Sequence, residues 1–213
     1  MPELVRLAKE LSGQTPIVKQ LRKNLGLFYG ETGKIALSRQ IFSNNKIPSS
    51  VLAHEIGHLI DWLPDHTLAR GNMFGRLMSL RKYLKQTFGD IEIKNKTIKQ
   101  ELIDLSKSWL ASEKVRTTPV ELYAEAISVL LNDPDKLESI APEFTKIFWD
   151  NIDKKPEVKT ALLNIKNVLS LPEKERLAMR QEDLRNMYRK GNELYYKKHL
   201  EHKQRRNLKN ALS

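Results

Sequence analysis

The residues best suited to chemistry lie in one short stretch, His54-Glu55-Ile56-Gly57-His58, inside the largely apolar run 51–61. Residues four apart lie on the same face of an α-helix, so His54 and His58 can direct their imidazoles toward one metal ion. Glu55 lies beside that face, where its carboxylate can act on a water molecule without binding the metal. This His-Glu-x-x-His spacing predicts a zinc-binding helix with Glu55 as general base.

The alternative interpretation is a helix with two incidental histidines. The chain contains only five His, and two of them stand at ligand spacing. A Glu buried between them would be costly without a role. We therefore expect a metal site, and because the chain has no Cys, that site must be built from His and carboxylate.

A catalytic zinc ion usually takes three protein ligands, so a third ligand must be found. Asp61 follows His54 by seven residues, which is about 10.5 Å along a helix and too far for both to bind one ion. We expect Asp61 instead to orient His58 or to hold the end of the helix. The third ligand should therefore come from another helix.

A second helix, expected to begin after Thr118, offers two glutamates four residues apart. The sequence Thr118-Pro119-Val120-Glu121 is typical of a capping box, in which Glu121 reaches back to the start of the helix. Glu125 stands among small and apolar residues and has no such structural explanation, so its carboxylate should be paired or metal-bound. We predict Glu125 as the third ligand.

The sequence His54–Asp61, followed by Glu121-Leu122-Tyr123-Ala124-Glu125-Ala126, resembles the zincin metallopeptidases whose third ligand is Glu (gluzincins). It is most similar to the branch of anthrax lethal factor. Residues 1 to about 171 also resemble metallopeptidase-like domains within large multidomain proteins of phages and other mobile elements. The resemblance implies an α+β, mostly α, zincin fold, with zinc bound by His54, His58 and Glu125.

The resemblance further implies that the region Leu27–Leu37 faces the substrate, with Ile35, Ala36 and Leu37 as its binding residues. Lethal-factor-like enzymes also place a Tyr about two turns before the ligand Glu, where it donates a hydrogen bond to the oxyanion. Thr118 stands at that position here. His66, Tyr83 and Arg116 remain as candidates for the donor.

The elements expected around the site are mostly helical. Two strands, 27–29 and 35–37, should form a hairpin whose turn is bracketed by Gly30 and Gly33, and a sheet edge beside the metal helix can hold an extended peptide. Apolar periodicity predicts further helices over 3–12, 16–25, 67–88, 97–112 and 173–210. Gly89-Asp90 and Asn95 mark the expected loop before the helix over 97–112.

Composition limits the partners and the compartment. The 213 residues, 40% of them hydrophobic, suit a domain over 1–171 with a helical extension over 172–213. We find no run long enough to span a membrane and no signal peptide, so we expect no membrane partner. The absence of Cys fits a reducing compartment, which for a phage protein means the host cytoplasm or the virion.

The formal charge of +11 favours a polyanionic neighbour. Between Glu173 and Ser213 there are 12 Lys or Arg and 6 Asp or Glu, for a net charge of +6. Lys197, Lys198, Arg205 and Arg206 are candidates for contact with nucleic acid or a partner protein. The simpler interpretation of the first half of this segment is a solvated helix that packs one apolar stripe on the body. The stripe contains Leu177, Leu184, Tyr188 and Tyr195.

The leading hypothesis is an intracellular zinc metallopeptidase that hydrolyses a peptide bond of a protein or peptide substrate, encoded by a phage or mobile element. One alternative is a nucleic-acid-associated virion or antirestriction component that uses the zincin fold as a scaffold. The other is an inactive, zinc-stabilised interaction domain.

Overall fold

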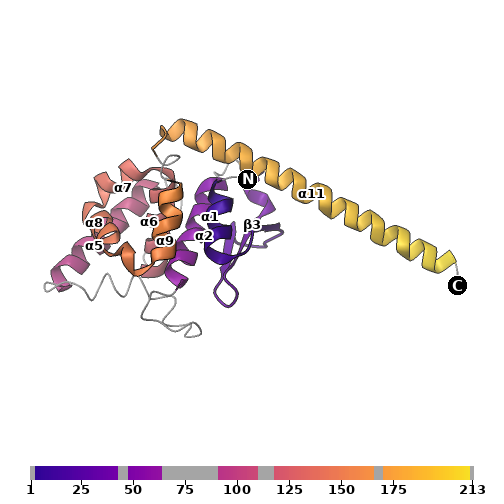
Figure 1. Cartoon of the computed structure of the whole chain (residues 1–213), viewed down its shortest axis with the longest axis horizontal. Helices are drawn as coiled ribbons and strands as arrows, with labels where there is room; N and C mark the ends of the chain where they lie inside the picture. Colours follow the sequence, from indigo (N-terminus) through magenta and orange to yellow (C-terminus); the bar gives the residue numbers. More distant parts are fainter. Residues whose placement is uncertain (1–2, 43–47, 64–90, 110–117, 166–169, 212–213) are drawn as a thin grey trace.

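The computed structural model describes residues 3–42, 48–63, 91–109, 118–165 and 170–211, and within this part the chain is mostly helical with a small sheet (Figure 1). This agrees with the predicted α+β, mostly α, class. Two buried helices, α2 (Pro48–Trp62) and α6 (Pro119–Asn132), pack against each other at the centre. Residues 52–61 of α2, except His58, and residues 122–132 of α6 are all buried, as expected for helices that neighbours cover on most sides.

The predicted N-terminal helix is confirmed as α1 (Glu3–Ser12), which packs on α2 and α9 (Pro156–Asn164). Its apolar residues recur at helical spacing and are buried against the core. Gly13 ends the helix in the left-handed region, with φ 72°, and its N–H donates to the Lys9 carbonyl over 2.8 Å. Glycine adopts this terminating conformation without the steric cost of a Cβ.

The sheet contains β1 (Ile17–Lys19), β2 (Gly26–Tyr29) and β3 (Lys34–Ser38), in the order β1-β3-β2. The predicted hairpin is confirmed as the antiparallel pair β2–β3, with Leu27 opposite Ala36. Gly33, at φ 68°, closes its turn by donating to the Tyr29 carbonyl. The predicted helix over 16–25 is wrong, because Ile17 and its β-branched neighbour pair in parallel with β3 instead.

Helix α6 also packs against α5 (Ile91–Trp109) and α7 (Pro134–Ile140). Proline stands at the first turn of α6 and of α7, α8 (Pro142–Asn151) and α9, where its missing N–H costs nothing. Helix α5 begins before the predicted residue 97 and includes Asn95, which was expected in a loop. The helix predicted over 67–88 lies outside the described residues. Two short 3₁₀ helices, η1 (Arg39–Phe42) and η2 (Ile152–Lys154), complete the body.

The predicted C-terminal helix is confirmed as α11 (Glu173–Ala211), which crosses the body and then projects beyond it (Figure 1). Its docked part packs on α2, α6 and η1. Leu184 is buried as predicted, and the Tyr188 ring stacks on Phe42 with 4.4 Å between centroids. Leu177 is only partly buried, whereas Arg176 and Arg180 are buried, which the predicted apolar stripe did not include.

Arg180 of α11 links this helix to α1 and α6 through hydrogen bonds. Its Nε donates to Glu3 of α1, and its Nη1 donates to the Leu131 carbonyl and, over 3.1 Å, to the Asn132 side chain of α6. Among the helices in the described ranges, none is both long and apolar enough to cross a membrane.

Candidate metal centre

The two central helices approach each other closely at Gly57. A Cβ built on Gly57 would lie 2.7 Å from Ala124 Cα and 2.8 Å from the Ala124 carbonyl oxygen. A larger residue at position 57 would therefore push α6 away. This contact brings the first turns of α6 against the face of α2 that carries the two histidines.

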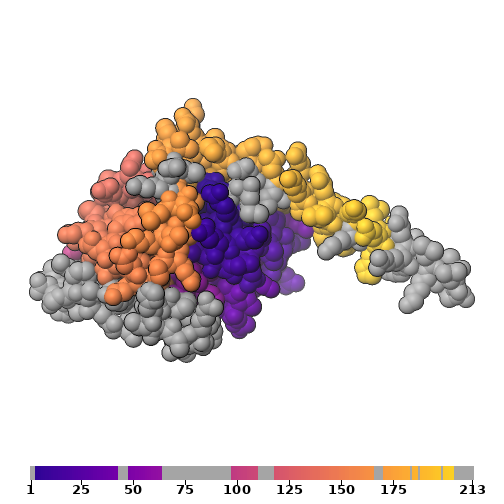
Figure 2. Space-filling view, in the orientation of Figure 1, coloured from indigo at the N-terminus to yellow at the C-terminus, as the bar shows by residue number. Residues whose placement is uncertain are grey.

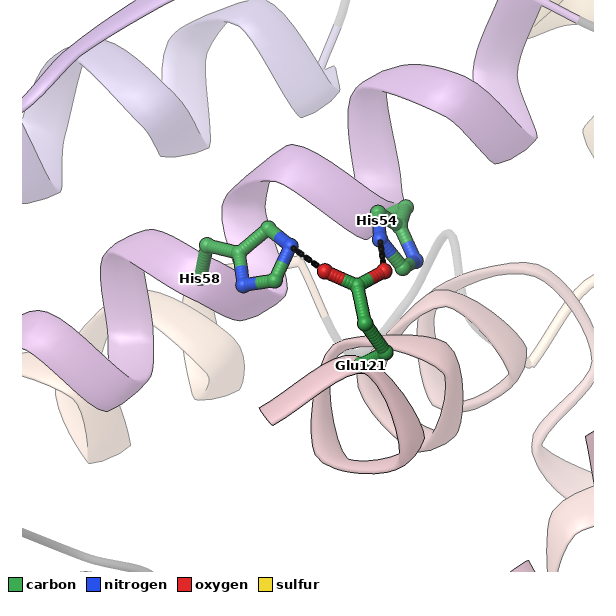
Figure 3. Close-up of side chains that lie close together, drawn as sticks. All are labelled: His54, His58 and Glu121. Carbon is green, nitrogen blue, oxygen red and sulfur yellow. Dashed lines mark hydrogen bonds and ion pairs between the residues drawn. The ribbon is translucent and has the colours of Figure 1, made fainter. Parts of the chain in front are cut away.

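Glu121 faces both histidines across this contact (Figure 3). Its Oε2 lies 3.2 Å from His54 Nε2, and its Oε1 lies 3.4 Å from His58 Nε2. The two imidazoles are nearly perpendicular, with ring centroids 4.8 Å apart. One donor atom from each of the three side chains lies within 4.8 Å of the others. The described residues thus contain a His-His-Glu cluster that could hold a metal ion.

The donor atoms belong to side chain types that bind metal ions in proteins. The two His–Glu separations, 3.2 and 3.4 Å, end on different oxygens of Glu121, Oε2 for His54 and Oε1 for His58. Two imidazole nitrogens and a carboxylate oxygen are also a donor set that catalytic zinc sites use.

The surroundings of Glu121 favour its ionised form. Hydrogen bonds with His54, then His58, hold the pKa of the Glu121 carboxyl far below its usual range, although partial burial acts in the opposite direction. A carboxylate is the form that binds a metal cation. Its side chain remains 36% exposed, so the cluster is open to solvent on this side.

The carboxylate in the cluster is that of Glu121, whereas Glu125 was predicted as the third ligand. Thr118 is the N-cap of α6 with proline after it, as predicted, but it makes no side-chain cap hydrogen bond, so the expected capping box is not formed. The carboxylate of Glu121 turns toward α2 because two imidazoles lie within reach there. The sequence contained an indication of this contact. A Glu in the first turn of one helix can reach two His that stand four residues apart on a helix packed against it.

Glu125 lies on the other side of His54. Its Oε2 is 3.1 Å from His54 Nδ1, and its side chain is almost fully buried. This distance is that of an ion pair, and it places the His54 ring between the Glu125 and Glu121 carboxylates. The prediction that Glu125 is paired or metal-bound is therefore met by pairing with the histidine.

Strand β2 runs along α2 beside the cluster. A Cβ on Gly26 would lie 2.5 Å from Glu55 Oε1, so the Glu55 carboxylate packs directly against the backbone at the start of β2. Two residues on, the Phe28 ring stacks with His58 at a centroid distance of 6.4 Å. Alternate residues of a strand share one face, which explains why Gly26 and Phe28 both face α2. Phe28 lies within the region 27–37 that was expected to face the substrate, whereas Gly26 was not predicted, because nothing in the hairpin pattern specified which face α2 covers.

The predicted substrate residues Ile35, Ala36 and Leu37 occupy a different place. They belong to β3, which pairs with β1 on one side and β2 on the other, and all three are buried. A central strand has no free edge for a peptide, so this prediction does not fit the observed topology. In the sheet of the described residues, β2 is the edge strand nearest the cluster.

The other predicted site residues lie farther from the cluster or outside the description. Asp61 is buried near the end of α2, where the nearby Lys155 ammonium donates to the Ile60 carbonyl and lies 3.4 Å from the Asp61 carbonyl. Its predicted role in orienting His58 stays a prediction. The oxyanion candidates His66, Tyr83 and Arg116 lie outside the described residues.

The basic candidates belong to the projecting part of α11, away from the cluster (Figure 1). Lys197 is exposed there. Lys198, Arg205 and Arg206 lie in the same helix, but their side chains are outside the description.

No family model, curated protein or solved structure matches the chain.

Proposed function

We propose that the protein is a zinc-dependent metallopeptidase of the zincin type, with His54, His58 and Glu121 as metal ligands and Glu55 as general base. The observation that carries the proposal is the convergence of one donor atom each from His54, His58 and Glu121 within 4.8 Å of one another, with both histidines on the helix that also holds Glu55. The cytoplasm of the host cell, or a virion, is the proposed setting, with a phage or mobile element as the source.

Each side chain has a defined part in this mechanism. His54 and His58 would hold the metal through their imidazoles and Glu121 through its carboxylate, while Glu125, 3.1 Å from His54 Nδ1, would orient that ring. When bound, zinc would polarise the scissile carbonyl and lower the pKa of a water molecule. Glu55 takes a proton from the attacking water and passes it to the leaving amine, so a C–O bond forms as the C–N bond breaks.

The edge of β2 supplies a place for an extended peptide. Strand β2 pairs only with β3 in the described sheet, and Gly26 and Phe28 place it alongside Glu55 and His58. A substrate strand added to this edge would gain main-chain hydrogen bonds next to the general base. This favours peptides over small molecules as substrates.

The decisive experiment measures zinc and hydrolysis separately. Wild type, Glu55→Gln and His58→Ala are each analysed for zinc by elemental analysis and for cleavage of a peptide library by mass spectrometry. We expect Glu55→Gln to keep zinc and lose cleavage, because the general base is not a ligand, and His58→Ala to lose both. Equal zinc content in wild type and His58→Ala would refute the assignment of the site, and zinc without any cleavage in wild type would refute the peptidase.

A further inference from the structure

The charge of the chain is concentrated at one end of α11. Residues 173–195 carry six Lys or Arg and five Asp or Glu, for a net charge of +1. Residues 196–211, which we call the basic arm, carry six Lys or Arg and one Glu, for a net charge of +5. Sixteen residues therefore hold almost half of the net charge of the whole protein, which is +11.

The change in charge coincides with the end of the docked part of the helix. Leu184 is buried, Tyr188 stacks on Phe42, and the Arg39 guanidinium lies 4.9 Å from the centre of the Tyr195 ring. Beyond this contact Tyr196 is 66% exposed and Leu200 is 60% exposed. Helix α11 carries the arm beyond the body (Figure 1), and the part of the arm that is coloured in Figure 2 stands clear of the body.

The pattern of the arm favours a polyanion over a membrane or a protein groove. A helix that lies on a membrane, or in an apolar groove, needs one continuous apolar face. Leu194, just before the arm, and Tyr196 are both exposed but stand about 160° apart around the helix, and among the exposed apolar side chains described for the arm Tyr196 and Leu200 share a side. The high charge density instead complements a partner with closely spaced negative charges.

The dimensions of the arm suit duplex DNA. Sixteen helical residues span about 24 Å, and a helix of about 10–12 Å diameter fits the major groove of B-DNA, about 12 Å wide. The six basic positions of the arm, 197, 198, 203, 205, 206 and 209, are distributed around more than one side of the helix. A helix in a groove has a phosphate backbone on each side, whereas the major groove of duplex RNA is too narrow to admit one.

We propose that the basic arm of α11 binds duplex DNA through its phosphates, without sequence preference, and holds the body of the protein beside the DNA. This interaction is separate from the proposed hydrolysis, because the arm lies outside the metal centre.

The test measures binding of the full chain to a 30-base-pair DNA duplex by fluorescence anisotropy between 50 and 200 mM salt. If five phosphates are neutralised, log K should fall against log[salt] with a slope of about −4.5, which is about a 500-fold loss over this range. Substituting Lys197, Lys198 and Lys203 by Gln should reduce the slope to about −1.8 and the loss to about 12-fold. Glu55→Gln should bind DNA as the wild type does.

The matched control replaces three exposed lysines of the body and of the docked part of α11, Lys99, Lys146 and Lys174, by Gln. It removes the same charge and should leave the slope near that of wild type. An RNA duplex of the same sequence and vesicles containing phosphatidylserine are measured in parallel, and both should bind more weakly than DNA. Equal losses in the two triple variants, or RNA or vesicle binding as tight as DNA binding, would overturn the proposal.

Discussion

At the scale of single residues, the central feature is an imidazole held between two carboxylates. His54 presents Nε2 to Glu121 and Nδ1 to Glu125, at 3.2 and 3.1 Å. The two contacts are similar in length but differ in chemical consequence. A carboxylate beside Nε2 can share a metal with the ring, whereas one beside Nδ1 can only orient the ring and raise its basicity.

The two glutamates should therefore differ when each is changed to Gln. Glu125→Gln should weaken zinc binding by about 10- to 100-fold, the usual cost of losing a group that orients a ligand. Glu121→Gln should weaken it further, because it removes the negative charge from the metal ligand itself. Zinc affinity measured by competition with a chromogenic chelator checks the order.

Glu157→Gln, at an exposed position of α9, serves as the control and should bind zinc like wild type. A greater loss in Glu125→Gln than in Glu121→Gln would return the ligand role to Glu125.

Gly26 should control the position of the general base. A methyl group there would lie 2.5 Å from Glu55 Oε1, so Gly26→Ala must displace the carboxylate or the strand. We expect peptide cleavage to fall at least 10-fold while zinc content stays that of wild type, because Glu55 is not a ligand. Gly30→Ala in the same hairpin is the matched control, since its Cβ would meet nothing closer than 3.9 Å. Equal activity of the two variants would contradict the role of Glu55 as general base.

The sequence was sufficient to predict the residue types of the site but not which glutamate faces which nitrogen of His54. The spacing of His54 and His58 placed both on one helical face, and of the two glutamates on the facing helix Glu121 was given a capping role and Glu125 the ligand role. Which glutamate faces Nε2 depends on how α6 crosses α2, and no local pattern encodes that crossing. The capping-box motif was a plausible local role for Glu121 that a stronger interaction with two imidazoles replaced.

At the scale of elements, the site depends on the close contact of α2 and α6. Gly57 lies opposite the Ala124 backbone, and no side chain larger than hydrogen fits between them. Because Glu121 stands three residues before Ala124, separation of the helices here would also draw Glu121 away from the histidines. Stability and metal binding are therefore linked at this position.

Gly57→Ala should reduce both properties. The added methyl group would lie 2.7 Å from Ala124 Cα, and overpacking of this kind typically costs about 1–3 kcal/mol in the free energy of unfolding. Urea unfolding and zinc titration check the two effects.

Gly191→Ala, in α11, is the control for replacing a helical glycine, because its Cβ would meet nothing within 4 Å. Alanine there should be neutral or stabilising by up to about 1 kcal/mol, since it favours the helix more than glycine does. Unchanged stability and zinc affinity in Gly57→Ala would contradict the prediction, because α2 and α6 would then tolerate the added methyl group without loss of either property.

Elements were predicted best where periodicity was strong. Helices α1, α2, α6 and α11 and the β2–β3 hairpin follow from apolar spacing, proline and paired glycines. Strand β1 was missed because its three residues gain their structure from parallel pairing with β3, which follows later in the chain. Short segments of this kind are decided by tertiary contacts more than by local propensity.

At the scale of the whole molecule, Arg180 fastens the C-terminal helix to the body. Burial lowers the pKa of Arg180, and its hydrogen bond to the Glu3 carboxylate acts in the opposite direction. The pair is almost fully enclosed, with Arg180 completely buried. An apolar stripe did not predict this contact, because a buried arginine is identified only by the partners that surround it.

Arg180→Met should destabilise the protein by about 3–5 kcal/mol, because it leaves the buried Glu3 carboxylate without its cation. Adding Glu3→Leu should recover part of that loss, since two apolar groups can replace a buried ion pair. Urea unfolding of the two single variants and the double variant measures the coupling. Arg185→Met, at an exposed position of the same helix, should have little effect, and a double variant less stable than Arg180→Met would contradict the pairing.

The Glu3–Arg180 contact also bears on the order in which the chain assembles. It joins residues 177 positions apart, whereas the contact between His54 and Glu121 joins residues only 67 apart. During synthesis from the N-terminus, both central helices leave the ribosome well before Arg180 does. We therefore expect the ligand cluster to form first and α1 to gain its last partner late, an order that pulsed hydrogen exchange during refolding would reveal as earlier protection in α6 than in α1.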